Sequence, residues 1–171
     1  LVDTPPQVDL GGVRRIVGFM TANPDGFANL DDAAAAIAAY NPHRPPPKNS
    51  AGLGKVLRQG ADGRWRWHWD PAFMTERHAL MESDPDTWAA ERQEMSDRLH
   101  ESAGAMRAPL LLVRGLQSDL VSDDAVAALR AAAPAATYVD VRGAGHMVAG
   151  DDNDAFTAAV ADFLGRHVPT A

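Results

Sequence analysis

Two polar residues near the end of the chain stand where a hydrolytic enzyme would place an acid and a base. Asp119 lies shortly after the apolar run 109–115 (PLLLVRG), and His146 lies between glycines in the segment 143–147 (GAGHM). Each follows a segment with the composition of a strand, so both are expected in loops at one edge of a sheet. An Asp that accepts a hydrogen bond from a His fixes the ring tautomer and leaves the other nitrogen to act as a general base. We therefore predict that Asp119 and His146 belong to a nucleophile–His–Asp triad.

The nucleophile of such a triad has no candidate in this sequence. A serine nucleophile commonly stands in a G-x-S-x-G turn between a strand and a helix, and the 171 residues do not contain that pattern. The sequence also opens on Leu1 rather than Met. The expectation is that a further segment, outside this chain, supplies the nucleophile.

The elements around Asp119 and His146 form a β-α-β-α pattern over residues 106–171. The continuous apolar run 110–113 predicts a strand covered on both faces, and 137–141 (TYVDV) predicts a second strand. Ser122 is expected to cap the helix between them, and two strands joined by a crossover helix are parallel. A last helix is predicted from about Asp152 because four apolar residues follow at helical spacing: Phe156, Val160, Phe163 and Leu164.

Other carboxylates near the two candidates could compete with Asp119 for the role of the acid. They stand at expected helix starts, where the helix dipole and capping already explain a carboxylate. These residues are Asp123, Asp124, Asp151 and Asp152. Asp119 is therefore the preferred acid.

Residues 10–105 are expected to be mostly helical, with frequent breaks. Helical periodicity over 13–20, a capped Ala-rich segment that begins near Asn29, and a pattern over 86–105 each predict a helix. A short helix is expected near 50–58, and the three prolines at 45–47 predict an extended connector.

Tryptophans alternate with polar residues over 64–70 (RWRWHWD). At the strand period of two, Trp65, Trp67 and Trp69 share one face. Trp67, Trp69 and Met147, which follows the candidate base, are our candidates for an apolar substrate pocket. Packing in the core remains the alternative for all three, because large apolar side chains dominate core burial.

The composition excludes several classes of protein. A net charge of −7 argues against binding to nucleic acid or to an anionic membrane surface, and no apolar run approaches the ~20 residues of a membrane-spanning helix. The absence of cysteine excludes disulfides and thiolate metal sites, and fits a cytoplasmic protein. The histidines outside the candidate site are scattered, so we predict no metal and no cofactor.

The segments 112–122 (LVRGLQSDLVS) and 143–151 (GAGHMVAGD) resemble the acid and histidine segments of the α/β-hydrolase family. They are most similar to its cofactor-free haloperoxidase, esterase and epoxide-hydrolase-like branch, and 1–6 (LVDTPP) resembles the end of the family's sixth strand. The resemblance implies a partial α/β-hydrolase fold in which the edge of a parallel sheet is flanked by helices. Residues 1–9 would end a core strand, 10–105 would form a mostly helical cap, and 106–171 would complete the core.

The same resemblance implies a function. The expected reaction is hydrolysis of a small apolar ester, lactone or related substrate, with the N-terminal half of the fold as the partner that carries the nucleophile. A serine nucleophile would give esterase chemistry, and an aspartate would give epoxide-hydrolase or dehalogenase chemistry. A catalytically inert truncated chain and a binding module remain alternatives.

Overall fold

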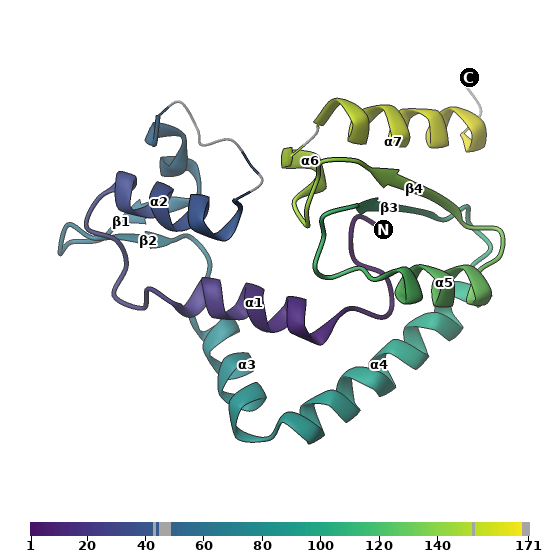
Figure 1. Cartoon of the computed structure of the whole chain (residues 1–171), viewed down its shortest axis with the longest axis horizontal. Coiled ribbons are helices and arrows are strands. Elements are labelled where there is room, and N and C mark those ends of the chain that lie inside the picture. The colour runs from purple at the N-terminus through teal and green to yellow at the C-terminus, as the bar shows by residue number, and fades with distance from the viewer. Residues whose placement is uncertain (43, 45–48, 152, 169–171) are drawn as a thin grey trace. The chain divides into compact units, whose positions relative to one another are not determined.

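The structure is a computed structural model that describes residues 1–42, 44, 49–151 and 153–168. Contacts divide the chain into two compact units. Figure 1 colours the chain by residue number from the N-terminus to the C-terminus. The sheet unit comprises residues 1–13 and 85–171, and the hairpin unit comprises residues 14–84. The predicted connector at 45–47 and the predicted helix start at Asp152 lie outside the described residues.

The sheet unit contains the two predicted strands. β3 (Leu111–Gly115) and β4 (Thr137–Val141) pair in parallel, with Leu111 opposite Thr137 and Gly115 opposite Val141. All five residues of β3 are buried, as expected for a strand that is covered on both faces. The predicted strands and their parallel pairing are confirmed.

Helices cover both faces of this pair of strands (Figure 1). α5 (Asp123–Ala132) connects them, and its predicted cap is confirmed because the Ser122 side chain accepts a hydrogen bond from the Ala125 amide. α7 (Asn153–His167) follows the short helix α6 (Val148–Asp151) and packs its apolar residues against Leu111, Val113 and Val141. α4 (Pro85–Ala105) lies beside α5.

The first three residues run along β3. Val2 forms a parallel bridge with Val113, the Asp3 amide donates to the Val113 carbonyl at 2.8 Å, and the Val113 amide donates to the Leu1 carbonyl at 3.0 Å. β3 therefore lies between this segment and β4, because adjacent residues of a strand direct their backbone groups to opposite neighbours. This pairing brings Asp3 to the end of β3.

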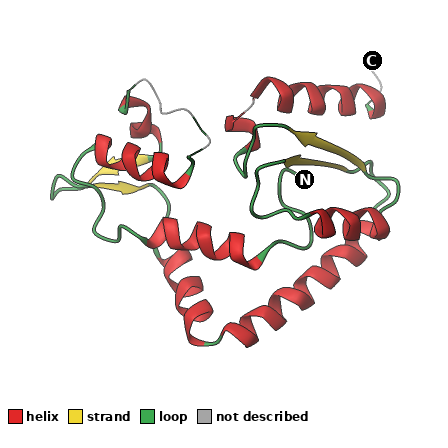
Figure 2. Ribbon diagram, in the orientation of Figure 1, coloured by secondary structure: helices red, strands yellow, loops and turns green. Residues whose placement is uncertain are grey.

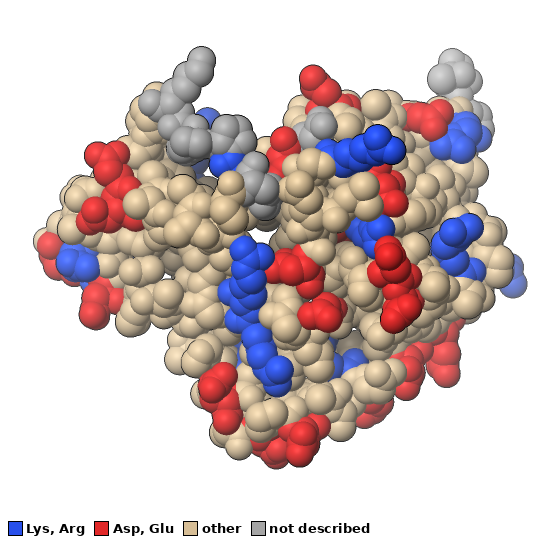
Figure 3. Space-filling model, viewed as in Figure 1, with Lys and Arg blue, Asp and Glu red and all other residues tan. Residues whose placement is uncertain are grey.

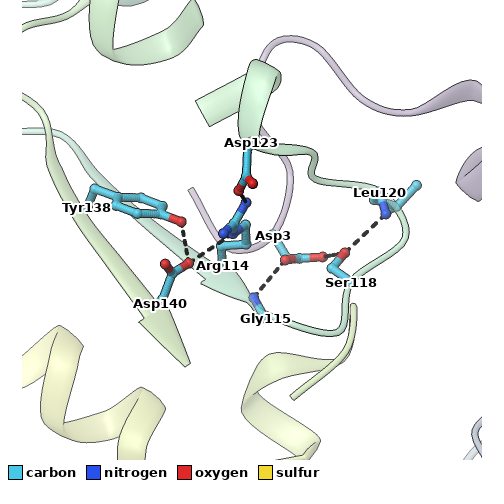
Figure 4. Close-up of polar contacts among 8 residues, drawn as sticks. All are labelled: Asp3, Arg114, Gly115, Ser118, Leu120, Asp123, Tyr138 and Asp140. Atoms are coloured by element: carbon cyan, nitrogen blue, oxygen red, sulfur yellow. Dashed lines mark hydrogen bonds and ion pairs between the residues drawn. The ribbon is translucent and has the colours of Figure 1, made fainter. Parts of the chain in front are cut away.

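An ion-pair cluster fastens the start of α5 to the two strands (Figure 4). The Arg114 guanidinium, which is buried, donates to Asp140 at 2.8 Å and to Asp123 at 2.6 Å. Tyr138 donates its hydroxyl to Asp140, and burial together with this hydrogen bond raises the pKa of Tyr138. The cluster holds the strand residue that directly precedes Gly115.

The hairpin unit is built around a short antiparallel pair of strands, seen in yellow among the helices in Figure 2. β1 (Leu57–Gln59) pairs with β2 (Trp65–Trp67), and Phe27 forms a further bridge with Trp65. α2 (Leu30–Tyr40) packs on this pair through the buried Ala33. α1 (Leu10–Thr21) enters the unit before the hairpin, and α3 (Ala72–Ser83) follows it.

The predicted helix near 50–58 is wrong in its second half. A 3₁₀ helix, η1, covers Ala51–Lys55, but the chain is extended from Leu57 onwards. Leu57 is fully buried opposite Trp67, so its side chain packs in the core of this unit while its backbone joins the ladder. Tertiary pairing here overrides a weak local preference for helix.

The exposed side of α4 is acidic. Figure 3 shows acidic side chains gathered along the lower edge of the view, where α4 runs. The exposed carboxylates of the helix are Asp86, Glu91, Glu94, Asp97 and Glu101. Within the described ranges, no helix combines the length and the apolar character that crossing a membrane requires.

Candidate active site

The imidazole of His146 contacts the carboxylate of Asp3. The His146 Nδ1 atom lies 3.0 Å from Asp3 Oδ2, and the two residues are 143 positions apart in the sequence. Asp3 follows the segment paired with β3, and His146 follows β4, so two strands of one sheet bring the pair together. The Asp3 side chain is fully buried, whereas the His146 side chain is 33% exposed. An imidazole with one nitrogen on a buried carboxylate and an accessible edge has the arrangement of a catalytic acid–base pair.

The buried carboxylate of Asp3 accepts several hydrogen bonds from its surroundings (Figure 4). Its Oδ1 atom accepts from the Gly115 amide at 2.9 Å, and its Oδ2 atom accepts from the Ser118 hydroxyl at 2.5 Å. Ser118 Oγ in turn accepts from the Leu120 amide at 3.1 Å. A buried charge needs partners of this kind, and they hold the carboxylate in one orientation toward His146.

The backbone of Asp3 adopts a conformation that is unusual for a residue with a side chain. Its φ is 48°, in the left-handed region, and it is the one described non-glycine residue with a positive φ. Such a conformation persists only where the surroundings hold it, and it is frequent at functional sites. Here the hydrogen bond from the Asp3 amide to the Val113 carbonyl and the bonds to the carboxylate hold Asp3 in place.

Glycines shape the loop that carries His146. Gly143 has a φ of 75°, which lets the chain turn directly after β4. Gly115 passes so close to this loop that a Cβ atom on it would lie 2.2 Å from the Gly145 carbonyl oxygen. The Gly145 amide donates to the Asp151 carboxylate at 2.9 Å, so the loop is tied to α6. The position of His146 therefore depends on close backbone packing at the end of β3.

The chain was compared with known proteins. No family model matches it. It is 32% identical to a 3-hydroxybutyrate-oligomer hydrolase from Cupriavidus necator, over 85% of this chain and 49% of that relative. Among solved structures, it is similar to an E-2-(acetamidomethylene)succinate hydrolase with a TM-score of 0.70 at 22% identity, over 96% of this chain and 56% of that chain.

Two further solved structures are similar to this chain in fold. An α/β hydrolase from Novosphingobium aromaticivorans matches with a TM-score of 0.63 at 24% identity, and an esterase from M. tuberculosis with 0.63 at 21%. Each match covers 96% of this chain, and 56% and 53% of the other chain, respectively. The chain carries part of the α/β-hydrolase fold. It spans about half the length of the curated relative and of the solved structures that it matches.

Within this α/β-hydrolase fold, the structure places Asp119 and His146 in loops after β3 and β4, where we expect them. Asp119 is half-buried in its loop. The hydrogen bond of the His146 ring, however, goes to Asp3. The role of Asp119 as the acid stays a prediction, and the geometry adds Asp3 as a second candidate.

Sequence reasoning missed Asp3, although a signal was present. Asp3 directly follows an apolar pair in a segment that we interpreted as the end of a strand. A carboxylate at the end of one strand is as well placed for the active site of an α/β-hydrolase fold as a carboxylate after the next strand. Asp3 stands 143 positions from His146, and only the sheet pairing joins the two.

The three predicted substrate-binding residues lie in two places. Trp67 and Trp69 line a cavity of about 100 Å³ in the hairpin unit, together with Met20, Thr21 and Pro71. Trp67 also packs on the core of that unit. Met147 lies beside His146 in the sheet unit and is 58% exposed, which does not fit the alternative of core packing. Substrate binding by these side chains stays a prediction.

No cluster suited to a metal ion occurs among the residues that the structure describes. Nowhere in this part of the chain do three or more His, Asp or Glu side chains gather in a way that could hold one.

Proposed function

We propose that the protein containing this chain hydrolyses an ester by a nucleophile–His–Asp mechanism, in which His146 is the base and Asp3 is the acid partner. The observation that carries this proposal is the contact of 3.0 Å between His146 Nδ1 and the fully buried Asp3 carboxylate. The hydrolase names of the curated relative and of the similar structures support the reaction class. The nucleophile would come from the part of the α/β-hydrolase fold that this chain does not span.

The mechanism follows from the orientation of the ring. With Nδ1–H donating to Asp3, the unprotonated Nε2 atom accepts the proton of the nucleophile as it attacks the ester carbon. The same proton then passes from Nε2 to the leaving alkoxide, and an acyl-enzyme ester remains. Water attacks this ester after giving a proton to Nε2, which releases the acid and restores the nucleophile. An aspartate nucleophile would need His146 for the water step alone.

For the substrate, we propose an ester between small hydroxy acids. The support is the curated relative, whose name describes a hydrolase of 3-hydroxybutyrate oligomers and which shares 32% identity with this chain. The exposed Met147 offers apolar surface next to His146, and we propose Trp67 and Trp69 as further apolar contacts for the substrate. Both contacts belong to the proposal.

The test is hydrolysis of the linear 3-hydroxybutyrate dimer by the complete protein, with release of monomer followed by chromatography. We expect turnover of the dimer and much slower turnover of a long-chain acyl ester. Labelling by a fluorophosphonate, located by mass spectrometry, would identify a serine nucleophile. Failure to hydrolyse either ester, with a folded protein, would favour an inert chain or a binding module.

Ser118 is expected to position the acid rather than to touch the substrate. Its hydroxyl donates to Asp3 Oδ2 at 2.5 Å, beside the contact of that atom with His146. Removing a hydrogen bond to a buried carboxylate should cost about 1.5–3 kcal/mol, so Ser118→Ala should lower kcat about 10–100-fold with little change in KM. Steady-state kinetics check this expectation. Ser118→Thr keeps the hydroxyl and should retain most of the activity, and equal losses in both variants would refute the positioning role.

A further inference from the structure

A second feature of the sheet unit is a cavity of about 320 Å³. The segment 6–11, one face of α4 and Ser122 line it, and neither Asp3 nor His146 does. The α4 residues that face it include Arg92 and Ser96, which are one helical turn apart. The mechanism proposed above gives this cavity no role.

Arg92 is the unusual member of this lining. Its Nε atom is buried and has no hydrogen-bond partner in the structure. Among the described residues, none of the ion pairs involves its guanidinium. A buried donor without an acceptor is unfavourable by about 1–3 kcal/mol, and more when the group is charged. An anionic ligand in the cavity would supply the missing acceptors.

Two other polar groups line the same cavity. The Ser122 Oγ atom accepts from the Ala125 amide, which leaves its own hydrogen available to a ligand. The Asp9 Oδ1 atom accepts from the Gly12 amide at 2.9 Å, and the remaining lone pairs of this carboxylate can accept a donor from a ligand. The cavity thus combines a cation without a partner, a hydroxyl donor and a carboxylate acceptor.

We propose that this cavity binds a small organic carboxylate that also carries a hydroxyl group. The ligand carboxylate would lie on the planar guanidinium of Arg92, which matches two carboxylate oxygens at once, and the ligand hydroxyl would donate to Asp9. The carboxylate of Asp9 disfavours a ligand with negative charge at both ends. The exposed side of α4 is acidic (Figure 3), so anions should not gather on the outer surface of the helix.

Titration calorimetry on the complete protein tests this site, with 3-hydroxybutyrate as the probe. We expect the affinity for 3-hydroxybutyrate to fall at least 10-fold in Arg92→Gln. The affinity should be intermediate in Arg92→Lys, which keeps the positive charge but cannot donate to both carboxylate oxygens from one planar group. Arg98→Gln is the matched control, because Arg98 is an exposed arginine of the same helix. It should bind like the unmodified protein, and thermal unfolding should show that all variants are folded.

Three further probes give the outcomes that would overturn the site. The neutral amide of 3-hydroxybutyrate, which is not an ester, should bind at least 10-fold more weakly, since it lacks the charge that pairs with Arg92. Butyrate should bind more weakly because it has no donor for Asp9, and equal affinity would refute the hydroxyl contact. Inorganic phosphate that binds as tightly as 3-hydroxybutyrate, or binding unaffected by Arg92→Gln, would refute the carboxylate site. The readout is binding, so these results are independent of whether the protein hydrolyses esters.

Discussion

Asp3→Asn is expected to lower kcat/KM of the complete protein by about 10⁴-fold, as loss of the acid does in other triads, and His146→Gln by at least as much. The reason lies in how the carboxylate is held. Its Oδ1 atom accepts from the Gly115 amide, so the oxygen of an asparagine would stay there and its NH₂ group would face His146. A donor at that place favours the tautomer in which Nδ1 is unprotonated. Nε2 then carries the hydrogen and cannot accept a proton from the nucleophile.

Asp119→Asn provides the control for this prediction. Asp119 stands in the neighbouring loop and was our first candidate for the acid, so the two substitutions make the same chemical change at competing positions. We expect less than a 10-fold loss for Asp119→Asn, measured on the same ester. The reverse pattern, with a large loss at Asp119 and a small one at Asp3, would show that Asp119 is the acid and would refute our assignment. The downfield NMR signal of the His146 Nδ1 proton should disappear only in Asp3→Asn.

Gly115→Ala is expected to destabilise the fold by about 3 kcal/mol, because the new methyl group cannot be accommodated. Its Cβ atom would lie 2.2 Å from the Gly145 carbonyl oxygen and 2.5 Å from the Ala144 carbonyl oxygen, and both are backbone atoms. Relief requires the loop that carries His146 to move away from β3. Urea unfolding measures the loss of stability, and the residual activity of the folded variant reports the displacement of His146.

Gly165→Ala is the matched control for that substitution. Gly165 lies in α7, and a Cβ atom there would meet nothing within 4 Å beyond its chain neighbours and the backbone of its own helix. An alanine in a helix is favoured over glycine by about 1 kcal/mol, so this variant should be slightly more stable than the unmodified protein and equally active. Equal stability of the two variants would contradict the close packing between β3 and the His146 loop.

The sequence predicted the elements that depend on local pattern. The apolar run before Asp119 and the segment 137–141 form the two parallel strands, and Ser122 caps the helix between them. These predictions succeed because burial, strand period and capping are properties of neighbouring residues. The loop position of His146 follows from them directly.

The elements that depend on distant partners were harder to predict. Leu57 is extended because it pairs with Trp67, which lies ten positions further along the chain. The partner of His146 is Asp3, which lies at the other end of the sequence. Asp119 fitted the expected spacing just as well. The contact between His146 and Asp3 depends on the pairing of residues 1–3 with β3, which no local pattern encodes.

The contacts of Asp3 have a consequence for how this site forms. Its carboxylate and backbone join residue 3 to residues 113, 115, 118 and 146, so each of these bonds closes a loop of more than 100 residues. Closing loops of this length is entropically unfavourable and slow. Helices or hairpins that form locally in either unit do not remove this requirement. During refolding, the contact between Asp3 and His146 should therefore be among the last features to form. Recovery of activity in the complete protein would then report that residues 1–3 have paired with β3, and not only that the helices and strands have formed.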